Sequence, residues 1–128
     1  MSTSPESTNV TVLIVEDDAV IATVIEEALK QAGFKVLPPT HTAEQGLQLA
    51  RQHRSTLALL DIELLGGTNG IELGSQLRQE LNIPCIFVSG RSEPETVAAS
   101  AEAQPISWLK KPFGPGSIVA SVQLALRR

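Results

Sequence analysis

The sequence predicts an α/β fold: a (βα)5 domain with a doubly wound, five-stranded parallel sheet and helices on both of its faces. Five short apolar runs of strand length alternate with segments whose apolar residues recur at helical spacing. The runs are apolar at consecutive positions, as in strands that are buried on both faces of a parallel sheet. The 128 residues are enough for one domain with its own hydrophobic core.

The predicted strands are aliphatic and partly β-branched, and polar residues or proline follow them. They cover residues 10–15, 34–38, 56–60, 84–88 and 105–109. The segment before the first strand, MSTSPESTN, is polar and is expected to form a flexible tail over residues 1–9. The domain itself is therefore expected over residues 10–128.

Capping residues mark several of the predicted helices. Asp18 is a suitable N-cap for the first helix, whose apolar residues recur at helical spacing until Gly33, a good residue for the position after a helix. Thr42 and Gln45 form a capping box before the second helix. The later helices are expected over residues 70–81, from Ser92, which forms a capping box with Glu95, to Ala103, and from about Pro115 to the end.

Composition and charge exclude several classes of function. The formal net charge is −4, and adjacent basic residues occur only in LKK and in the final LRR, so no direct contact with nucleic acid is expected. Cys85 is the only cysteine, which excludes an internal disulfide. No apolar run approaches the roughly 20 residues of a membrane span, and the N-terminus lacks the pattern of a signal peptide. A cytoplasmic protein without membrane insertion is expected.

Polar side chains gather where four of the five predicted strands end. They are Glu16, Asp17 and Asp18 after the first strand, Asp61 after the third, Ser89 after the fourth, and Lys110 and Lys111 after the fifth. Taken singly, each has an ordinary explanation, such as a helix cap for Asp18 or a solvated lysine. In a doubly wound sheet, however, the carboxyl ends of the strands share one edge, where ligands bind. Together these residues predict one functional site at that edge.

The residue types indicate the chemistry of this site. Several carboxylates at one edge repel each other unless a cation lies between them, and oxygen ligands without His or Cys suit Mg²⁺. A lysine beside a divalent site indicates a phosphoryl group, because an ammonium and Mg²⁺ together neutralise the charge on its oxygens. Ser89 can donate its hydroxyl to the same oxygens. Asp61, at the centre, is then the group that accepts the phosphoryl as an acyl phosphate.

Four motifs carry a resemblance to a known family: VLIVEDD, LLDIEL, FVSG and WLKKPF, in this order and spacing. Together they resemble the receiver domain of two-component response regulators, from about Val10 to the end of the chain. The resemblance implies the flavodoxin-like receiver fold with strand order 2-1-3-4-5.

The resemblance also assigns roles to the acidic residues. Asp61 matches the phosphorylated aspartate of the family. Glu16 and Asp17 match its acidic pair, with Asp17 a direct Mg²⁺ ligand and Glu16 acting through water. The main-chain carbonyl of Glu63 is expected to complete the ligands that the protein supplies to Mg²⁺.

Further positions match the residues that respond to phosphorylation in this family. Ser89 matches the switch hydroxyl, and Lys111 matches the lysine that pairs with the phosphate. Trp108 stands at the aromatic switch position, where Tyr or Phe is usual, and a cis Lys111-Pro112 peptide bond is implied. Because indole needs more room than a phenyl ring, we expect the alanine-rich helix that ends at Ala103 to be mobile and coupled to Trp108.

The resemblance implies a phosphorylation-activated signalling switch. The phosphoryl group comes from a sensor histidine kinase or a histidine phosphotransfer protein. The domain is not an enzyme with a separate substrate, although it catalyses its own phosphotransfer and autodephosphorylation. Because the sequence ends with the fifth helix, we expect a stand-alone receiver that signals to a downstream protein through the face of helix four, strand five and helix five. A phosphorylation-dependent dimer is compatible with this scheme.

Some features depart from the usual receiver pattern or carry further hypotheses. Leu65 and GGTNG make the loop after the third strand one residue longer, which is either a tolerated insertion or a subgroup feature that changes metal and kinase contacts. Glu63 and Arg91 each lie two residues beyond a key residue, and we expect them to pair across the phosphoryl group. His41 and His53 have no partners at ligand spacing, are expected to face solvent, and receive no role.

Two other functional classes stay open. A non-phosphorylated pseudo-receiver, which only binds other proteins, usually lacks an acidic residue or the lysine, and none is missing here. An aspartate-nucleophile phosphatase carries a second acid two residues after the nucleophile, followed by Thr or Val. Glu63 meets the first condition, whereas Leu65 stands where Thr or Val is needed. Flavin or nucleotide binding is disfavoured, because EDD would repel a phosphate and no Lys-Ser/Thr follows the glycines.

Overall fold

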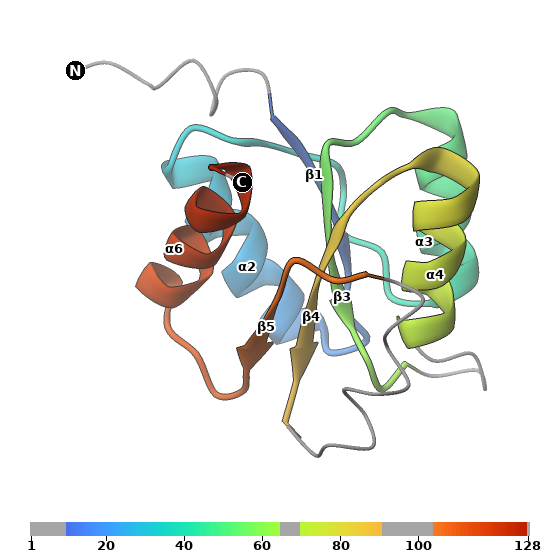
Figure 1. The fold of residues 1–128 in the computed structure, drawn as a ribbon. Helices are drawn as coiled ribbons and strands as arrows, with labels where there is room; N and C mark the ends of the chain where they lie inside the picture. The colour runs from blue at the N-terminus through green and yellow to red at the C-terminus, as the bar shows by residue number, and fades with distance from the viewer. Residues whose placement is uncertain (1–9, 65–69, 91–103, 128) are drawn as a thin grey trace.

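A five-stranded parallel sheet forms the centre of the molecule in the computed structural model, which describes residues 10–64, 70–90 and 104–127 (Figure 1). The strands are β1 (Thr11–Val15), β2 (Lys35–Val36), β3 (Leu57–Asp61), β4 (Cys85–Ser89) and β5 (Ser107–Lys110). Their order in the sheet is β2-β1-β3-β4-β5, and each neighbouring pair is parallel. The predicted fold class and strand order are confirmed.

Helices cover both faces of the sheet. Those described are α2 (Ala19–Gln31), α3 (Ala43–Gln52), α4 (Gly70–Leu81) and α6 (Pro115–Leu126). Figure 1 shows α2 and α6 on one face and α3 and α4 on the other. The helix predicted to open at Ser92, the tail over residues 1–9 and the loop from Leu65 lie outside the described residues.

The core has two halves because consecutive strand residues point to opposite faces. Ile14 and Leu59 pack with the α2 and α6 side chains, whereas Leu13, Leu60 and Phe87 pack with those of α3 and α4. This double burial explains why β1, β3 and β4 are apolar at consecutive positions, over residues 12–15, 57–60 and 85–88. None of the described helices has the length and apolar character needed to cross a membrane.

The predicted N-caps at Asp18 and Thr42 form, whereas the reciprocal bond of the Thr42 and Gln45 capping box does not, and the capping box predicted at Ser92 lies outside the described residues. Asp18 Oδ1 accepts hydrogen bonds of 2.9 and 3.1 Å from two backbone N–H groups of the first turn of α2. Thr42 Oγ1 accepts from the backbone N–H of Gln45 at 3.1 Å, while Gln45 Oε1 accepts from the N–H of His41 and not from that of Thr42. Gly33 follows α2 with a φ of 95°, in the left-handed region that favours glycine.

Three strands continue one residue beyond their apolar runs, so each of them ends on a polar residue. β3, β4 and β5 extend to Asp61, Ser89 and Lys110. The sheet register pairs Asp61 with Val88, and Ser89 with Lys110. The polar ends of three neighbouring strands therefore share one edge of the sheet.

Candidate functional site

Three carboxylates meet at the carboxyl edge of the sheet. Glu16 and Asp17 follow β1, Asp61 ends β3, and the two strands are neighbours. Carboxylate oxygens of the three residues lie within 4.8 Å of one another. Glu16 and Asp61 are buried, with 1% and 3% of their surface exposed, and Asp17 is half-buried. Like charges brought together in this way require a positive partner.

Lys111 provides a positive charge from the protein. Its Nζ lies 3.2 Å from Glu16 Oε1 and 3.4 Å from Asp61 Oδ2. The lysine follows β5, and its backbone N–H donates to the carbonyl of Ser89 at 2.8 Å. The Lys111-Pro112 peptide bond is cis, as predicted.

The crowded charges shift two pKa values. Burial, together with hydrogen bonding and repulsion by neighbouring carboxyl groups, raises the pKa of Asp61 to about 8, although Lys111 acts in the opposite direction. Burial alone would lower the pKa of Lys111, but Glu16 and Asp61 outweigh it and hold that pKa above the ordinary lysine value. One ammonium thus does not offset burial and the neighbouring carboxyl groups, and a further cation would favour the ionised form of Asp61.

The cluster fits a divalent cation with oxygen ligands. Glu16 Oε1 is buried and accepts no hydrogen bond from the described residues, since the nearby ammonium is not aligned with it. Opposite ligands of an octahedral Mg²⁺ are ~4.2 Å apart, so small side-chain movements would gather the carboxylate oxygens around one ion. Glu16, Asp17 and Asp61 could hold a metal ion on these grounds.

Main-chain N–H groups bind Asp61 and the residue after it. Its Oδ1 accepts a hydrogen bond of 3.1 Å from the backbone N–H of Glu63, whose side chain is exposed. Gly70, which begins α4, donates its N–H to the carbonyl of Ile62 at 2.8 Å. A Cβ at Gly70 would overlap the carbonyl oxygen of Asp61 and approach the Cα of Ile62 to 2.9 Å. The glycine allows this close approach, a role that its place in the sequence, as the first residue of a helix, does not reveal.

The two predicted switch residues lie on neighbouring strands. Ser89 ends β4 and is buried, with 3% of its surface exposed. Trp108 is half-buried in β5, in register with Phe87, and the two ring centroids are 5.3 Å apart at an angle of 49°. Trp108 therefore packs on the core face covered by α3 and α4. Its predicted partner helix and Arg91, the predicted partner of Glu63, lie outside the described residues.

His41 contacts the main chain of Glu16, although the sequence assigned it no role. The residue is exposed, as expected, but its ring Nδ1 lies 2.8 Å from the carbonyl oxygen of Glu16. A carbonyl only accepts, so Nδ1 is the donor. The contact depends on the return of the chain after β2 and has no signal in the local sequence. His53 is exposed at the end of α3, as expected.

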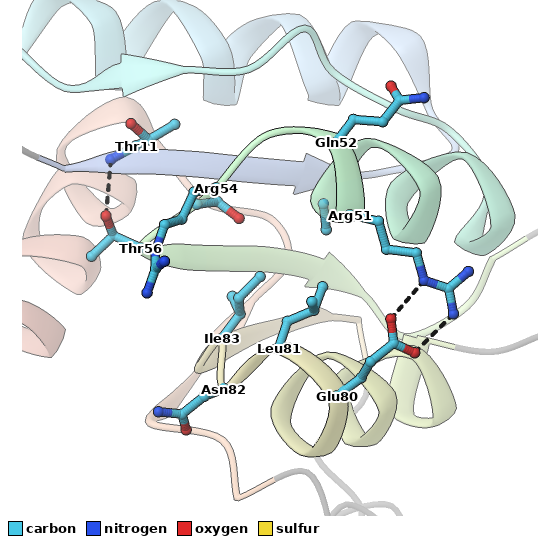
Figure 2. A pocket seen from close by; sticks show the side chains of 11 residues that line it. Thr11, Arg51, Gln52, Arg54, Thr56, Glu80, Leu81, Asn82 and Ile83 are labelled. Atoms are coloured by element: carbon cyan, nitrogen blue, oxygen red, sulfur yellow. Dashed lines mark hydrogen bonds and ion pairs between the residues drawn. The ribbon is translucent and has the colours of Figure 1, made fainter.

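A separate hollow of about 900 Å³ lies at the opposite edge of the sheet (Figure 2). Residues near the beginnings of β1 and β3 and near the ends of α3 and α4 line it. Arg51 and Glu80 form a two-pronged ion pair beside it, with Nε–Oε2 and Nη2–Oε1 distances of 2.6 and 2.8 Å. Because these charges are already paired and Asp61 is at the other edge, the candidate chemistry belongs to the carboxylate cluster.

The sequence of the chain matches one protein family. A family model described as the response regulator receiver domain matches residues 12–123. The chain belongs to this family, whose members act in two-component signalling.

Individual relatives support the same assignment. The KDP operon transcriptional regulatory protein KdpE of Escherichia coli (strain K12) is 38% identical over 117 residues, which cover 91% of this chain and 51% of that protein. The phosphate regulon transcriptional regulatory protein PhoB of Pseudomonas aeruginosa is 34% identical over 121 residues, covering 92% and 52%. The chain thus spans about half the length of the curated relatives it matches.

Solved structures show the same architecture. A response regulator receiver domain protein (CheY-like) from Methanospirillum hungatei JF-1 superposes with a TM-score of 0.84 and 27% identity, covering 92% of this chain and 94% of that chain. The signal receiver domain of a modulated diguanylate cyclase from Desulfovibrio desulfuricans G20 has a TM-score of 0.83 and 30% identity, covering 91% and 93%.

Proposed function

We propose that residues 10–128 form a phosphorylation-activated switch that takes a phosphoryl group onto Asp61, in the presence of Mg²⁺, from a phosphohistidine donor. One observation carries the proposal: buried Asp61 lies among two further carboxylates and the Lys111 ammonium at a single edge of the sheet. Burying such a cluster is costly, and a domain that only bound other proteins would gain nothing from it.

Each acidic residue has a distinct part in this proposal. A carboxylate oxygen of Asp61 attacks phosphorus, so that an O–P bond forms while the N–P bond of the phosphohistidine breaks and the imidazole leaves. Asp17, Asp61 and the main-chain carbonyl of Glu63 hold Mg²⁺, and Glu16 acts through water. When bound, Mg²⁺ supplies positive charge to the oxygens of the transferred group.

The remaining site residues bind and report the phosphoryl group. Lys111, with Nζ 3.4 Å from Asp61 Oδ2, pairs with its oxygens, and the Ser89 hydroxyl donates a hydrogen bond to them. Trp108 of β5 packs on Phe87, which lies two residues before Ser89 in β4. In this proposal Trp108 responds to the hydrogen bond that Ser89 makes to the phosphoryl group. The same residues catalyse autodephosphorylation, in which water attacks phosphorus, the O–P bond to Asp61 breaks, and inorganic phosphate and the free carboxylate result.

The partners in this proposal follow from the family. The donor is a sensor histidine kinase or a histidine phosphotransfer protein, and the location is cytoplasmic. The output is a protein contact at the face of the predicted fourth helix, β5 and α6, with a partner or with a second copy in a phosphorylation-dependent dimer. That fourth helix lies outside the described residues, and in α6 Leu124 exposes 61% of its surface. Such a contact would act as a population shift between two packings.

Fluorescence of Trp108, the only tryptophan, tests the site. We would titrate Mg²⁺ and then beryllium fluoride, a phosphoryl mimic, into the wild type and into Asp61→Asn. The proposal predicts a saturable, Mg²⁺-dependent change in the wild type that Asp61→Asn lacks. Identical responses of the two proteins would contradict it and favour the non-phosphorylated pseudo-receiver.

A further inference from the structure

His41 binds the main chain from which the two acidic residues after β1 project. Glu16 donates its N–H to the carbonyl of Thr40 at 2.9 Å, next to the isolated bridge between Val15 and Thr40. The carbonyl of the same Glu16 accepts a hydrogen bond from His41 Nδ1 at 2.8 Å. Residues 40 and 41 thus bind both main-chain polar groups of Glu16.

The hydrogen bond from His41 to the Glu16 carbonyl affects the direction of the Asp17 side chain. The Glu16 carbonyl belongs to the planar peptide unit that joins Glu16 to Asp17, so a hydrogen bond to the carbonyl fixes the orientation of that unit. β1 has already ended at Val15, and the ring supplies the kind of bond that a neighbouring strand supplies within the sheet. Repulsion among the carboxylates favours rotation of this unit away from Asp61, and the hydrogen bond opposes it.

Hydrogen bonds on both sides hold the segment that carries His41. Its backbone N–H donates to Gln45 Oε1 at 3.1 Å, and the next residue, Thr42, is the N-cap of α3. On its other side, the hydroxyl of Thr40 donates to the carbonyl of Ile14 at 2.8 Å. The ring therefore projects from a segment that is tied both to β1 and to the start of α3.

We propose that His41 is a positioning residue of the phosphoacceptor site, which presets Asp17 for Mg²⁺ by holding the Glu16 carbonyl. The inference rests on the proposed function, in which Asp17 binds Mg²⁺ and Asp61 is phosphorylated. His41 does not touch the reacting atoms. It needs only a hydrogen on Nδ1, which the Nδ1–H tautomer and the imidazolium both carry.

Three variants test this role. His41→Ala removes the donor, His41→Asn places an amide N–H where Nδ1 lies, and His53→Ala is the matched control at the other histidine. Mg²⁺ affinity is read from Trp108 fluorescence, and labelling of Asp61 by acetyl phosphate is read from intact mass. We expect Mg²⁺ affinity to fall about fivefold in His41→Ala, as for loss of one hydrogen bond, and to stay within about twofold of the wild type in His41→Asn and His53→Ala.

The outcomes separate this inference from the proposed function. A wild type that binds Mg²⁺ and is labelled, beside a His41→Ala variant that behaves identically, would overturn the inference alone. Equal losses in His41→Ala and His41→Asn would also overturn it, because the ring and not its N–H would then matter. A wild type that neither binds Mg²⁺ nor is labelled would overturn the proposed function and this inference with it.

Nitrogen NMR of the wild type gives a readout that needs no variant to fold. The inference predicts a slowly exchanging proton on Nδ1 of His41, in contrast to His53. A proton on Nε2 alone would contradict it.

Discussion

Lys111 shares one ammonium between two buried carboxylates from different strands, with Nζ 3.4 Å from Asp61 Oδ2 and 3.2 Å from Glu16 Oε1. Burial and the neighbouring carboxyl groups raise the pKa of Asp61 to about 8, and the single positive charge of Lys111 does not offset them. The site therefore gains stability from added positive charge. We infer that this imbalance makes the edge of the sheet responsive to Mg²⁺.

Mg²⁺ affinity should rise with pH up to about 8. Below the Asp61 pKa of about 8, the ion must displace a proton before it can bind the carboxylate. The apparent dissociation constant should fall by up to about tenfold per pH unit between pH 6 and 8, and then level off. Titrations followed by Trp108 fluorescence at several pH values measure this slope. A flat profile would show that Asp61 is already ionised at pH 6.

The stability of the metal-free protein should fall as pH rises from about 4 to about 8. The unfolded chain releases the Asp61 proton near its ordinary pKa of about 3.9, whereas the folded protein retains it up to about 8. Because the folded state binds the extra proton in this window, raising the pH removes a stabilising contribution. Urea unfolding in EDTA should show the decline in the wild type and a smaller one in Asp61→Asn. Equal slopes would contradict the assignment to Asp61.

Lys111→Gln should destabilise the metal-free protein by roughly 1–2 kcal/mol at pH 7, since it leaves the buried carboxylate of Glu16 without its cationic partner. The exposed neighbour offers a matched control, Lys110→Gln, which should change the free energy of unfolding by less than about 0.5 kcal/mol. Urea denaturation in EDTA measures both. Similar losses in the two variants would mean that the ion pairs of Lys111 contribute nothing to stability.

Gly70→Ala should lower stability by about 1–3 kcal/mol and slow the labelling of Asp61, because the added Cβ collides with the carbonyl of Asp61. Gly116→Ala in α6 is the control: nothing lies within 4 Å of a Cβ built there. Alanine at that position should stabilise the helix by about 0.5 kcal/mol. Thermal unfolding and intact-mass kinetics test the pair, and unchanged labelling in Gly70→Ala would remove the glycine from the account of the site.

The sequence was sufficient to predict the fold and the gathering of the acidic residues and Lys111 at one edge, for a physical reason. Apolar residues at consecutive positions mark strands buried on both faces, and parallel strands bring their carboxyl ends to one edge. Asp17, Asp61 and Lys111 each follow such a run, so the topology alone brings them together. Their order along the chain therefore carries spatial information.

Other features depend on the hydrogen-bond ladder, on prolines or on long-range contacts, which the apolar pattern alone does not encode. β3 and β4 continue through Asp61 and Ser89 because the hydrogen-bond ladder uses main-chain atoms and does not stop at a polar side chain. β2 covers two residues and not the predicted five, since Pro38 and Pro39, which follow shortly, have no N–H to donate to a ladder. The contact of His41 with Glu16 joins residues 25 apart in sequence and appears only once the chain is folded.

Intact-mass analysis after incubation with acetyl phosphate tests the central claim most directly. With Mg²⁺ present, the wild type should gain the mass of one phosphoryl group, and the gain should disappear in EDTA and in Asp61→Asn. A wild type that gains no mass, or an Asp61→Asn variant that gains as much, would contradict the assignment of Asp61 as the phosphoacceptor.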